Sequence, residues 1–328
     1  MDREQEEMQL LGFCGIIKES IKLIFTWRKI FSQITLALLL PLSFTFLAYT
    51  ETSHFLKAKI QHDQSALNHA KAGTPKYKML SNLVTSDIIE LSLSRVAYCI
   101  LVLMFSLLSM STVVYTIACV YTSRPITFGR AISVVPKVWK RLMVTYLWGF
   151  LATIVYTICT TVTILICYLL LDLLHSPAIK LTLGFILLIL SLFGLAYINV
   201  IWHLAGVISV LEDIYGIQAM FKSKNMVKGK TGISVAISLL LTIVPVAIHT
   251  VLRIFMANGY EFGFLRFGIA TLSFLLLLAS TLISLVAQTV IYFVCKSYHD
   301  ENINKSALLL DEYVPLQAND VLSKQVNV

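Results

Sequence analysis

The chain has 328 residues, of which 57% are hydrophobic and 13% are charged, and its mean hydropathy is +0.80. These values exclude an ordinary soluble globular protein, in which about 25% of residues are charged. The formal net charge of +8 is compatible with a nucleic-acid or a membrane-surface partner. Because the cations stand beside apolar runs and no nucleic-acid-binding motif is recognised, we expect a membrane surface and no nucleic acid.

Residues 1–29 are predicted to be a cytosolic N-terminus that ends in an amphipathic helix. The apolar residues Leu10, Cys14, Ile17, Ile21 and Ile24 recur at helical spacing, whereas Lys18 and Lys22 lie around the opposite side. The stretch then continues with Trp27-Arg28-Lys29. A Trp followed by two cations suits the headgroup layer at the cytosolic end of a membrane span. The first apolar run begins only at residue 30, so no cleavable signal peptide is expected.

Six runs without Asp, Glu, Lys or Arg follow, and each reaches the roughly 20 helical residues that a bilayer core requires. They are residues 30–50, 96–123, 142–171, 181–211, 231–252 and 267–295. The sequence therefore predicts an all-α polytopic membrane protein with a six-span domain over residues 30–295. Residues 51–95 are predicted to be an outer loop, and residues 296–328 a disordered cytosolic tail.

The distribution of Lys and Arg predicts the orientation of the spans. One side of the predicted membrane domain carries 17 of these cations and the other side nine. The cation-rich side includes both termini. By the positive-inside rule, both termini are expected in the cytosol.

A basic amphipathic segment also precedes the third and the fifth runs. Before the third run, the apolar residues Phe128, Ile132, Val135 and Trp139 form a stripe, and Pro136 is expected to kink or end the helix. Before the fifth run, the stripe consists of Ile217, Met220, Phe221 and Val227, and Gly229 is expected to break the helix.

The pattern of an amphipathic helix followed by a two-span hairpin thus occurs three times. Because each unit has an even number of spans, the copies would be parallel repeats that all start on the same side of the membrane. The alternative also stays open, since basic connectors are common in polytopic membrane proteins.

Three segments resemble a plant family of uncharacterised six-span membrane proteins. They are Leu10-Leu-Gly-Phe-Cys-Gly-Ile-Ile-Lys-Glu-Ser20, Thr26-Trp-Arg-Lys-Ile-Phe-Ser-Gln-Ile34 and Leu310-Asp-Glu-Tyr-Val-Pro-Leu316. A fourth segment, between Val210 and Gly229, is more distantly similar to bacterial six-span domains, some of which are fused to glycerophosphodiester phosphodiesterases. The resemblance implies the six-span architecture and brings no catalytic residue, because the soluble phosphodiesterase part is absent from this sequence.

The cations of the amphipathic segments predict a basic collar that faces lipid. We define the basic collar as Lys18, Lys22, Arg28, Lys29, Arg130, Lys137, Lys140, Arg141, Lys222, Lys228 and Lys230. Clusters of this kind beside membrane spans are typical of contacts with anionic lipids of the cytosolic leaflet. These lipids are the predicted partner.

Polar residues within the runs are the candidates for a transport path. Asn199 and His203 lie one helical turn apart in the fourth run, and Gln288 lies in the sixth. They can line a solute path or bond one another between helices, and the second interpretation is favoured. The third run contains five threonines, at positions 153, 157, 160, 161 and 163. Their hydroxyl groups can bond backbone carbonyl groups and allow close helix packing, or they can line a polar pore.

No catalytic triad, phosphate-binding glycine loop or metal-ligand pattern stands out, so no enzyme activity, cofactor or metal is expected. The adjacent acids Glu212 and Asp213 are expected to point about 100° apart on a helix rather than to converge.

Two short cytosolic patterns resemble sorting signals that adaptor complexes read. Glu6, Leu10 and Leu11 form an acidic dileucine pattern, and Tyr313 and Leu316 form a tyrosine-based one. The alternative is that Leu10 and Leu11 simply begin the amphipathic helix and that the tail has no reader.

The leading functional hypothesis is a non-enzymatic protein of the endomembrane system or plasma membrane that organises lipid or partner proteins. The second is a transporter or channel for a small solute, with its path near His203. The third, a membrane enzyme that acts on lipid, rests on analogy alone.

Overall fold

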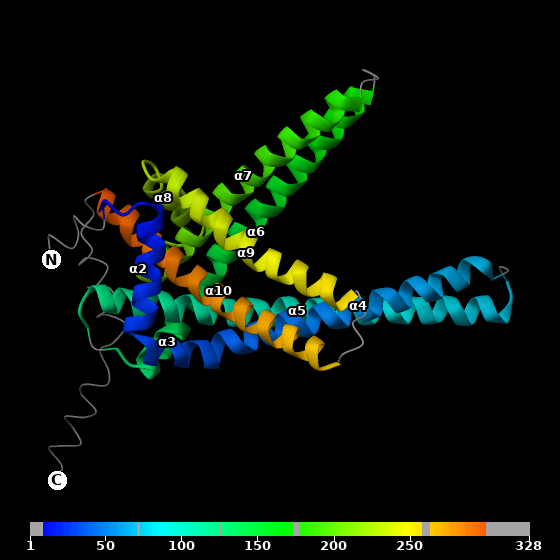
Figure 1. The fold of residues 1–328 in the computed structure, drawn as a ribbon, viewed down its shortest axis with the longest axis horizontal. Helices are drawn as coiled ribbons and strands as arrows, with labels where there is room; N and C mark the ends of the chain where they lie inside the picture. The colour runs from blue at the N-terminus through cyan, green and yellow to red at the C-terminus, as the bar shows by residue number, and fades with distance from the viewer. Residues whose placement is uncertain (1–8, 71–72, 125, 173–176, 258–262, 300–328) are drawn as a thin grey trace, which may run out of the picture. The chain divides into compact units, whose positions relative to one another are not determined.

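The computed structural model describes residues 9–70, 73–124, 126–172, 177–257 and 263–299, and within these ranges it contains helices and no strand (Figure 1). In chain order the helices are α2 (Phe13–Thr26), α3 (Arg28–Ile34), the π-helical turn η1 (Thr35–Leu39), α4 (Leu40–His69), α5 (Pro75–Tyr121), α6 (Phe128–Asp172), α7 (Pro177–Leu211), α8 (Ile217–Met226), α9 (Thr231–Ala257) and α10 (Gly263–Tyr298).

Six stretches within the described residues are long and apolar enough to cross a membrane. They are Arg28–His69, Pro75–Tyr121, Phe128–Leu170, Leu181–Leu211, Thr231–Val251 and Thr271–Tyr298. Each overlaps one of the six predicted runs. The prediction of an all-helical chain with six helices of membrane-spanning length and composition is therefore confirmed.

The chain divides into two compact units, one made of residues 1–34 and 110–328 and the other of residues 35–109. The smaller unit begins with η1. Pro41 has no N–H to bond the carbonyl group of Ala37, which explains why the helix widens into a π turn just before α4.

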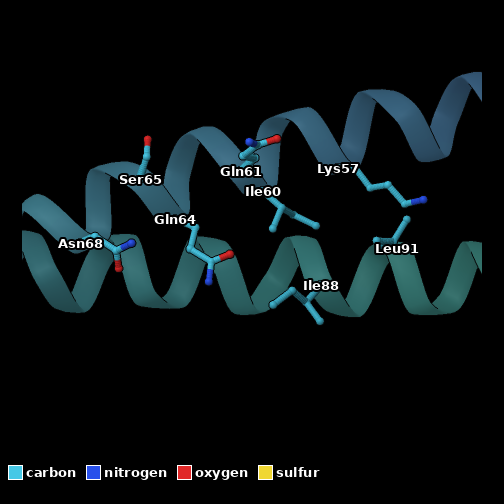
Figure 2. Close-up of a pocket in the computed structure, with 8 residues that line it drawn as sticks. All are labelled: Lys57, Ile60, Gln61, Gln64, Ser65, Asn68, Ile88 and Leu91. Atoms are coloured by element: carbon cyan, nitrogen blue, oxygen red, sulfur yellow. The ribbon is translucent and has the colours of Figure 1, made fainter. Parts of the chain in front are cut away.

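In the smaller unit α4 and the first part of α5 form a helical hairpin (Figure 1). The rings of Tyr49 and Tyr98 stack with centroids 4.0 Å apart, and Lys59 Nζ donates to Asp87 Oδ1 at 2.8 Å. Between the two helices lies an open groove of about 490 Å³, lined mainly by polar side chains of α4 and by Ile88 and Leu91 of α5 (Figure 2).

The hairpin differs from the outer loop predicted over residues 51–95. Both helices continue through this segment, because Gly73 and Pro75 are its only glycine and proline and both lie at the turn. Gly73 has a φ of +88°, which glycine adopts without strain.

In the larger unit, the neighbouring helices α6 and α7 pack together as one hairpin and α9 and α10 as another (Figure 1). Helix α7 also contacts α8, α9 and α10, so it lies at the centre of the unit. The core is formed where α7, α10 and the end of α5 are buried, by residues such as Ile117, Leu204, Ile208, Val290 and Phe293. Beyond this core the apolar side chains of α6 and α7 are largely exposed, as expected where lipid is the solvent.

The segment before the third span differs from the predicted separate amphipathic helix. Helix α6 runs from Phe128 through Pro136 without ending. Pro136 lies in its third turn, where the neighbours Val134, Val135 and Val138 are buried and hold the segment in place. Separate short helices precede the first and third predicted repeats, as α2 with α3 and as α8, whereas in the second the corresponding residues begin a long helix.

The predicted helix break at Gly229 is confirmed. Helix α8 ends at Met226, α9 begins at Thr231, and Gly229 has a φ of +92° between them. A β-carbon at this position would overlap Cε1 of Tyr298 in α10. Glycine at position 229 therefore permits both the positive φ of the turn and the close approach of the α10 side chain Tyr298 to this turn.

Candidate functional site

A buried group of charged and polar side chains joins α7, α8 and α10. Glu212, one residue beyond α7, accepts hydrogen bonds at Oε1 from Tyr292 Oη at 2.8 Å and from Lys296 Nζ at 2.9 Å. Its Oε2 accepts one from Lys222 Nζ of α8 at 2.8 Å. We call these four residues the Glu212 cluster. Because both carboxylate oxygens are occupied, the cluster ties three helices together.

The turn after α7 brings Lys222 back to Glu212. Gly216 has a φ of +64°, and its backbone N–H donates to Thr145 Oγ1 of α6 at 2.8 Å. The Thr145 hydroxyl in turn lies 2.7 Å from Ser209 Oγ. On α8, Ser223 Oγ donates to the carbonyl group of Ile201 at 2.9 Å, so α8 is fixed against α7.

The charges of the cluster stabilise the ionised form of Glu212. The side chains of Glu212 and Lys296 are only 10% and 4% exposed, and that of Lys222 is 27% exposed. Burial of the carboxyl group by itself raises its pKa, but the hydrogen bond from Lys222 and the charge and hydrogen bond of Lys296 outweigh burial and hold the pKa below its ordinary value.

The neighbouring carboxylate, Asp213, points elsewhere. It pairs with Arg141 of α6, and both side chains are more exposed than those of Glu212 and Lys296. Glu212 and Asp213 thus have different partners, but they lie beyond the end of α7 and not on a helix, as the prediction assumed. Sequence reasoning missed the partners Tyr292 and Lys296, although their spacing of four residues, which places them on one face of α10, was visible.

The predicted polar residues within the spans are not joined by hydrogen bonds. In the part of the chain that the structure describes, Gln288 Nε2 donates to Ser284 Oγ of its own helix at 3.2 Å, and neither Asn199 nor His203 makes a side-chain hydrogen bond. The expectation that the three bond one another is therefore wrong. Two buried polar atoms in this region, Gln288 Oε1 and Trp202 Nε1, have no hydrogen-bond partner among the described residues.

The threonines of α6 bond their own helix. Each of the five hydroxyl groups donates to the carbonyl oxygen four residues earlier, at distances of 2.7 to 3.0 Å. Such bonds satisfy a hydroxyl group inside a bilayer without a partner helix.

Most cations of the basic collar are exposed. Lys18, Lys22, Arg28, Lys29, Arg130, Lys137, Lys140 and Lys228 are exposed, whereas Arg141, Lys222 and Lys230 are partly buried. Two collar members have structural roles: Arg141 pairs with Asp213, and Lys222 belongs to the Glu212 cluster. Lys230 lies over the ring of Tyr298, 5.6 Å from its centroid.

A pocket of about 590 Å³ lies between the α2–α3 turn and the start of α6. Trp27, Arg28, Lys29 and Gln33 line one side of it, and Thr127 and Phe128 line the other. We call it the collar pocket, because two of its lining residues belong to the basic collar.

The N-terminal sorting pattern lies mainly before α2. Leu10 is 84% exposed, and α2 begins only at Phe13, so Leu10 and Leu11 do not begin this helix. Glu6 of the same pattern, and Tyr313 and Leu316 of the tail pattern, lie outside the described residues.

These features define a helical protein with six candidate membrane spans among the described residues and a buried ion cluster at the ends of the fourth and the sixth. The chain belongs to the family described as a domain of unknown function (DUF8558), which matches residues 1–326. No curated protein and no solved structure matches the chain.

Proposed function

We propose that the protein is a non-enzymatic integral membrane protein that gathers anionic lipids, and through them partner proteins, at its basic collar. The observation that carries this proposal is the division of α2 into three faces. Ile16, Ser20 and Leu23 are buried. The predicted stripe is rotated from that face, and its members Cys14 and Ile21 are exposed.

The third face of α2 carries the exposed cations Lys18 and Lys22. A helix that packs on protein with one face and leaves an apolar and a cationic face free is suited to lie in the interface of an anionic membrane. The predicted stripe is therefore not the face of α2 that packs on protein, and we propose that lipid covers it.

Helix α8 repeats this arrangement. It buries Ala219, Ser223 and Met226, whereas Ile217 and Phe221 are 41% and 64% exposed. The proposed topology places both termini and both short helices in the cytosol. There the dileucine and tyrosine patterns would meet sorting adaptors of the endomembrane system, and the resemblance to the plant six-span family agrees with this architecture.

The proposal is tested by lipid enrichment in nanodiscs. The protein is assembled into discs from a mixture of phosphatidylcholine and phosphatidylserine, and the lipid ratio in loaded discs is compared with that in empty discs. Enrichment of phosphatidylserine supports the proposal, and an unchanged ratio contradicts it. The triple variant Lys18→Gln, Lys140→Gln and Lys228→Gln should lower the enrichment, and the matched triple variant Lys57→Gln, Lys76→Gln and Lys78→Gln of the smaller unit should not.

A second function, transport of a small solute, is favoured by the unpartnered buried atoms of Gln288 and of Trp202, whose ring stacks on that of His203. A polar atom buried without a partner is unfavourable unless water or a ligand reaches it. The test places one cysteine at position 203 in a chain that lacks the six native cysteines. Labelling by a membrane-impermeant thiol reagent in sealed membranes supports a solute path, and failure to label from either side contradicts it.

A further inference from the structure

The collar pocket combines charge with apolar surface. Its lining residues contain two cations, Arg28 and Lys29, and no carboxylate. Both cations are exposed, and neither forms an ion pair with another residue of the described ranges. The pocket is therefore positive and has no internal counter-charge.

The local chain geometry explains why a pocket opens here. Helix α2 ends at Thr26, and Trp27 leaves the helical conformation with φ −104° and ψ 33° before α3 begins. Helix α3 contacts α6, whose first residue is Phe128. The change of direction at Trp27 thus holds the two cations on one wall and the start of α6 on the other.

The aromatic and apolar walls narrow the choice of ligand. Trp27 is 36% exposed, while Ile30, Ile126 and Phe128 are partly buried. A small soluble anion gains little binding free energy from apolar side chains. In a phospholipid, the phosphate can bind the cations, and the glycerol and acyl region can pack against the apolar side chains. Arg28 also begins the stretch Arg28–His69, which is apolar enough to span a membrane, and Trp is typical of the headgroup layer.

We propose that the collar pocket binds one anionic phospholipid, with its phosphate held by the cations Arg28 and Lys29 that line the pocket and its glycerol region against Trp27 and Phe128. This inference rests on the proposed function and adds a defined site to it. The rest of the basic collar attracts anionic lipid to the surface, and the collar pocket retains a single molecule.

The test uses the full chain in phosphatidylcholine nanodiscs that contain a variable fraction of phosphatidylserine with brominated acyl chains. Bromine quenches nearby tryptophan fluorescence, and the contribution of Trp27 is the difference between the wild type and Trp27→Phe. Brominated phosphatidylserine should quench Trp27 more strongly than the same fraction of brominated phosphatidylcholine. Equal quenching by the two lipids overturns the inference.

The variant Arg28→Gln with Lys29→Gln should lower the apparent affinity for brominated phosphatidylserine roughly 25-fold, about fivefold for each cation removed near an anionic surface. The matched variant Lys18→Gln with Lys140→Gln removes two exposed collar cations outside the pocket and should leave most of the selectivity. Selectivity that survives Arg28→Gln with Lys29→Gln overturns the site.

Three further outcomes distinguish the possibilities. If inorganic phosphate alone reverses the excess quenching, the site belongs to a soluble phosphate and the lipid assignment is wrong. If discs are enriched in phosphatidylserine but the two brominated lipids quench Trp27 equally, the proposed function is supported and only the assignment of a lipid site to the collar pocket is wrong. If the discs are not enriched in phosphatidylserine and the two brominated lipids quench Trp27 equally, both the proposed function and the lipid site are wrong.

Discussion

Lys296 Nζ donates to Glu212 Oε1 at 2.9 Å, and this ion pair joins the end of α10 to the end of α7 inside the protein. Tyr292, one helical turn before Lys296, donates to the same oxygen atom. Because a buried charge without its partner is strongly unfavourable, each member of the Glu212 cluster depends on the others.

Replacing Glu212 by Gln should therefore destabilise the protein strongly. The variant leaves Lys222 and Lys296 without their counter-charge, and loss of one partner of a buried pair typically costs about 3 to 5 kcal/mol. Denaturant unfolding in a mild detergent measures the difference. The adjacent variant Asp213→Asn is the matched control, because the more exposed Asp213–Arg141 pair should contribute about 1 kcal/mol or less. Equal effects of the two variants would contradict the structural role of Glu212.

The same cluster predicts how stability depends on pH. The pKa of Glu212 is lower in the folded protein than its ordinary value of 4.5, so folding favours the ionised form. The stabilisation is fully present above about pH 4.5 and is lost as the pH falls through the lower folded-state value. Thermal unfolding between pH 7 and pH 3 should show a steeper acid-side decline for the wild type than for Glu212→Gln. Parallel pH profiles would show that Glu212 does not carry this dependence.

The tether of α8 can be tested at Lys222. Replacing it by Met removes the hydrogen bond from α8 to Glu212, so the amide hydrogens of α8 should exchange faster with solvent. Lys224→Met, which alters an exposed lysine of the same helix, should leave exchange unchanged. Hydrogen exchange of the protein in nanodiscs distinguishes the two. Unaltered exchange in Lys222→Met would mean that Ser223 and the buried face suffice to hold α8.

Gly229→Ala should destabilise the protein for two reasons. Its φ of +92° is unfavourable for alanine, and the added β-carbon would overlap the ring of Tyr298. Gly129→Ala provides the control, because that glycine lies in the first turn of α6, where an added β-carbon would meet no atom within 4 Å, so the change should not lower the free energy of unfolding. A Gly229→Ala variant as stable as the wild type would contradict the described turn.

The parts of the fold that follow from local sequence could be predicted. The six helices of membrane-spanning length follow from runs of apolar residues, and the break at Gly229 follows from glycine's conformational freedom. The divergence of Glu212 and Asp213 was predicted from helix geometry, but both residues lie beyond the end of α7. The helical course of residues 51–95 could also be predicted, since only Gly73 and Pro75 interrupt it, but the charged residues of this segment favour a loop when composition alone is considered.

The parts that depend on how helices meet could not be predicted. Glu212, Lys222 and Lys296 come together only because the turn at Gly216 redirects α8 and because α7 packs on α10. In α2, the sequence pattern of apolar residues does not distinguish the face that packs against protein from the apolar face that remains exposed. The collar pocket likewise requires α3 to lie beside the start of α6, a contact between segments about 100 residues apart.

The most direct test of the account is the lipid composition of nanodiscs that hold the wild-type chain, compared with discs that hold a variant in which Lys18, Arg28, Lys29, Lys140 and Lys228 are all changed to Gln. The account predicts that the wild type enriches phosphatidylserine over empty discs and that the variant, folded as judged by its unfolding transition, does not. A wild-type disc with the same lipid ratio as an empty disc, or a variant that enriches phosphatidylserine equally well, would contradict the claim that the basic collar gathers anionic lipid.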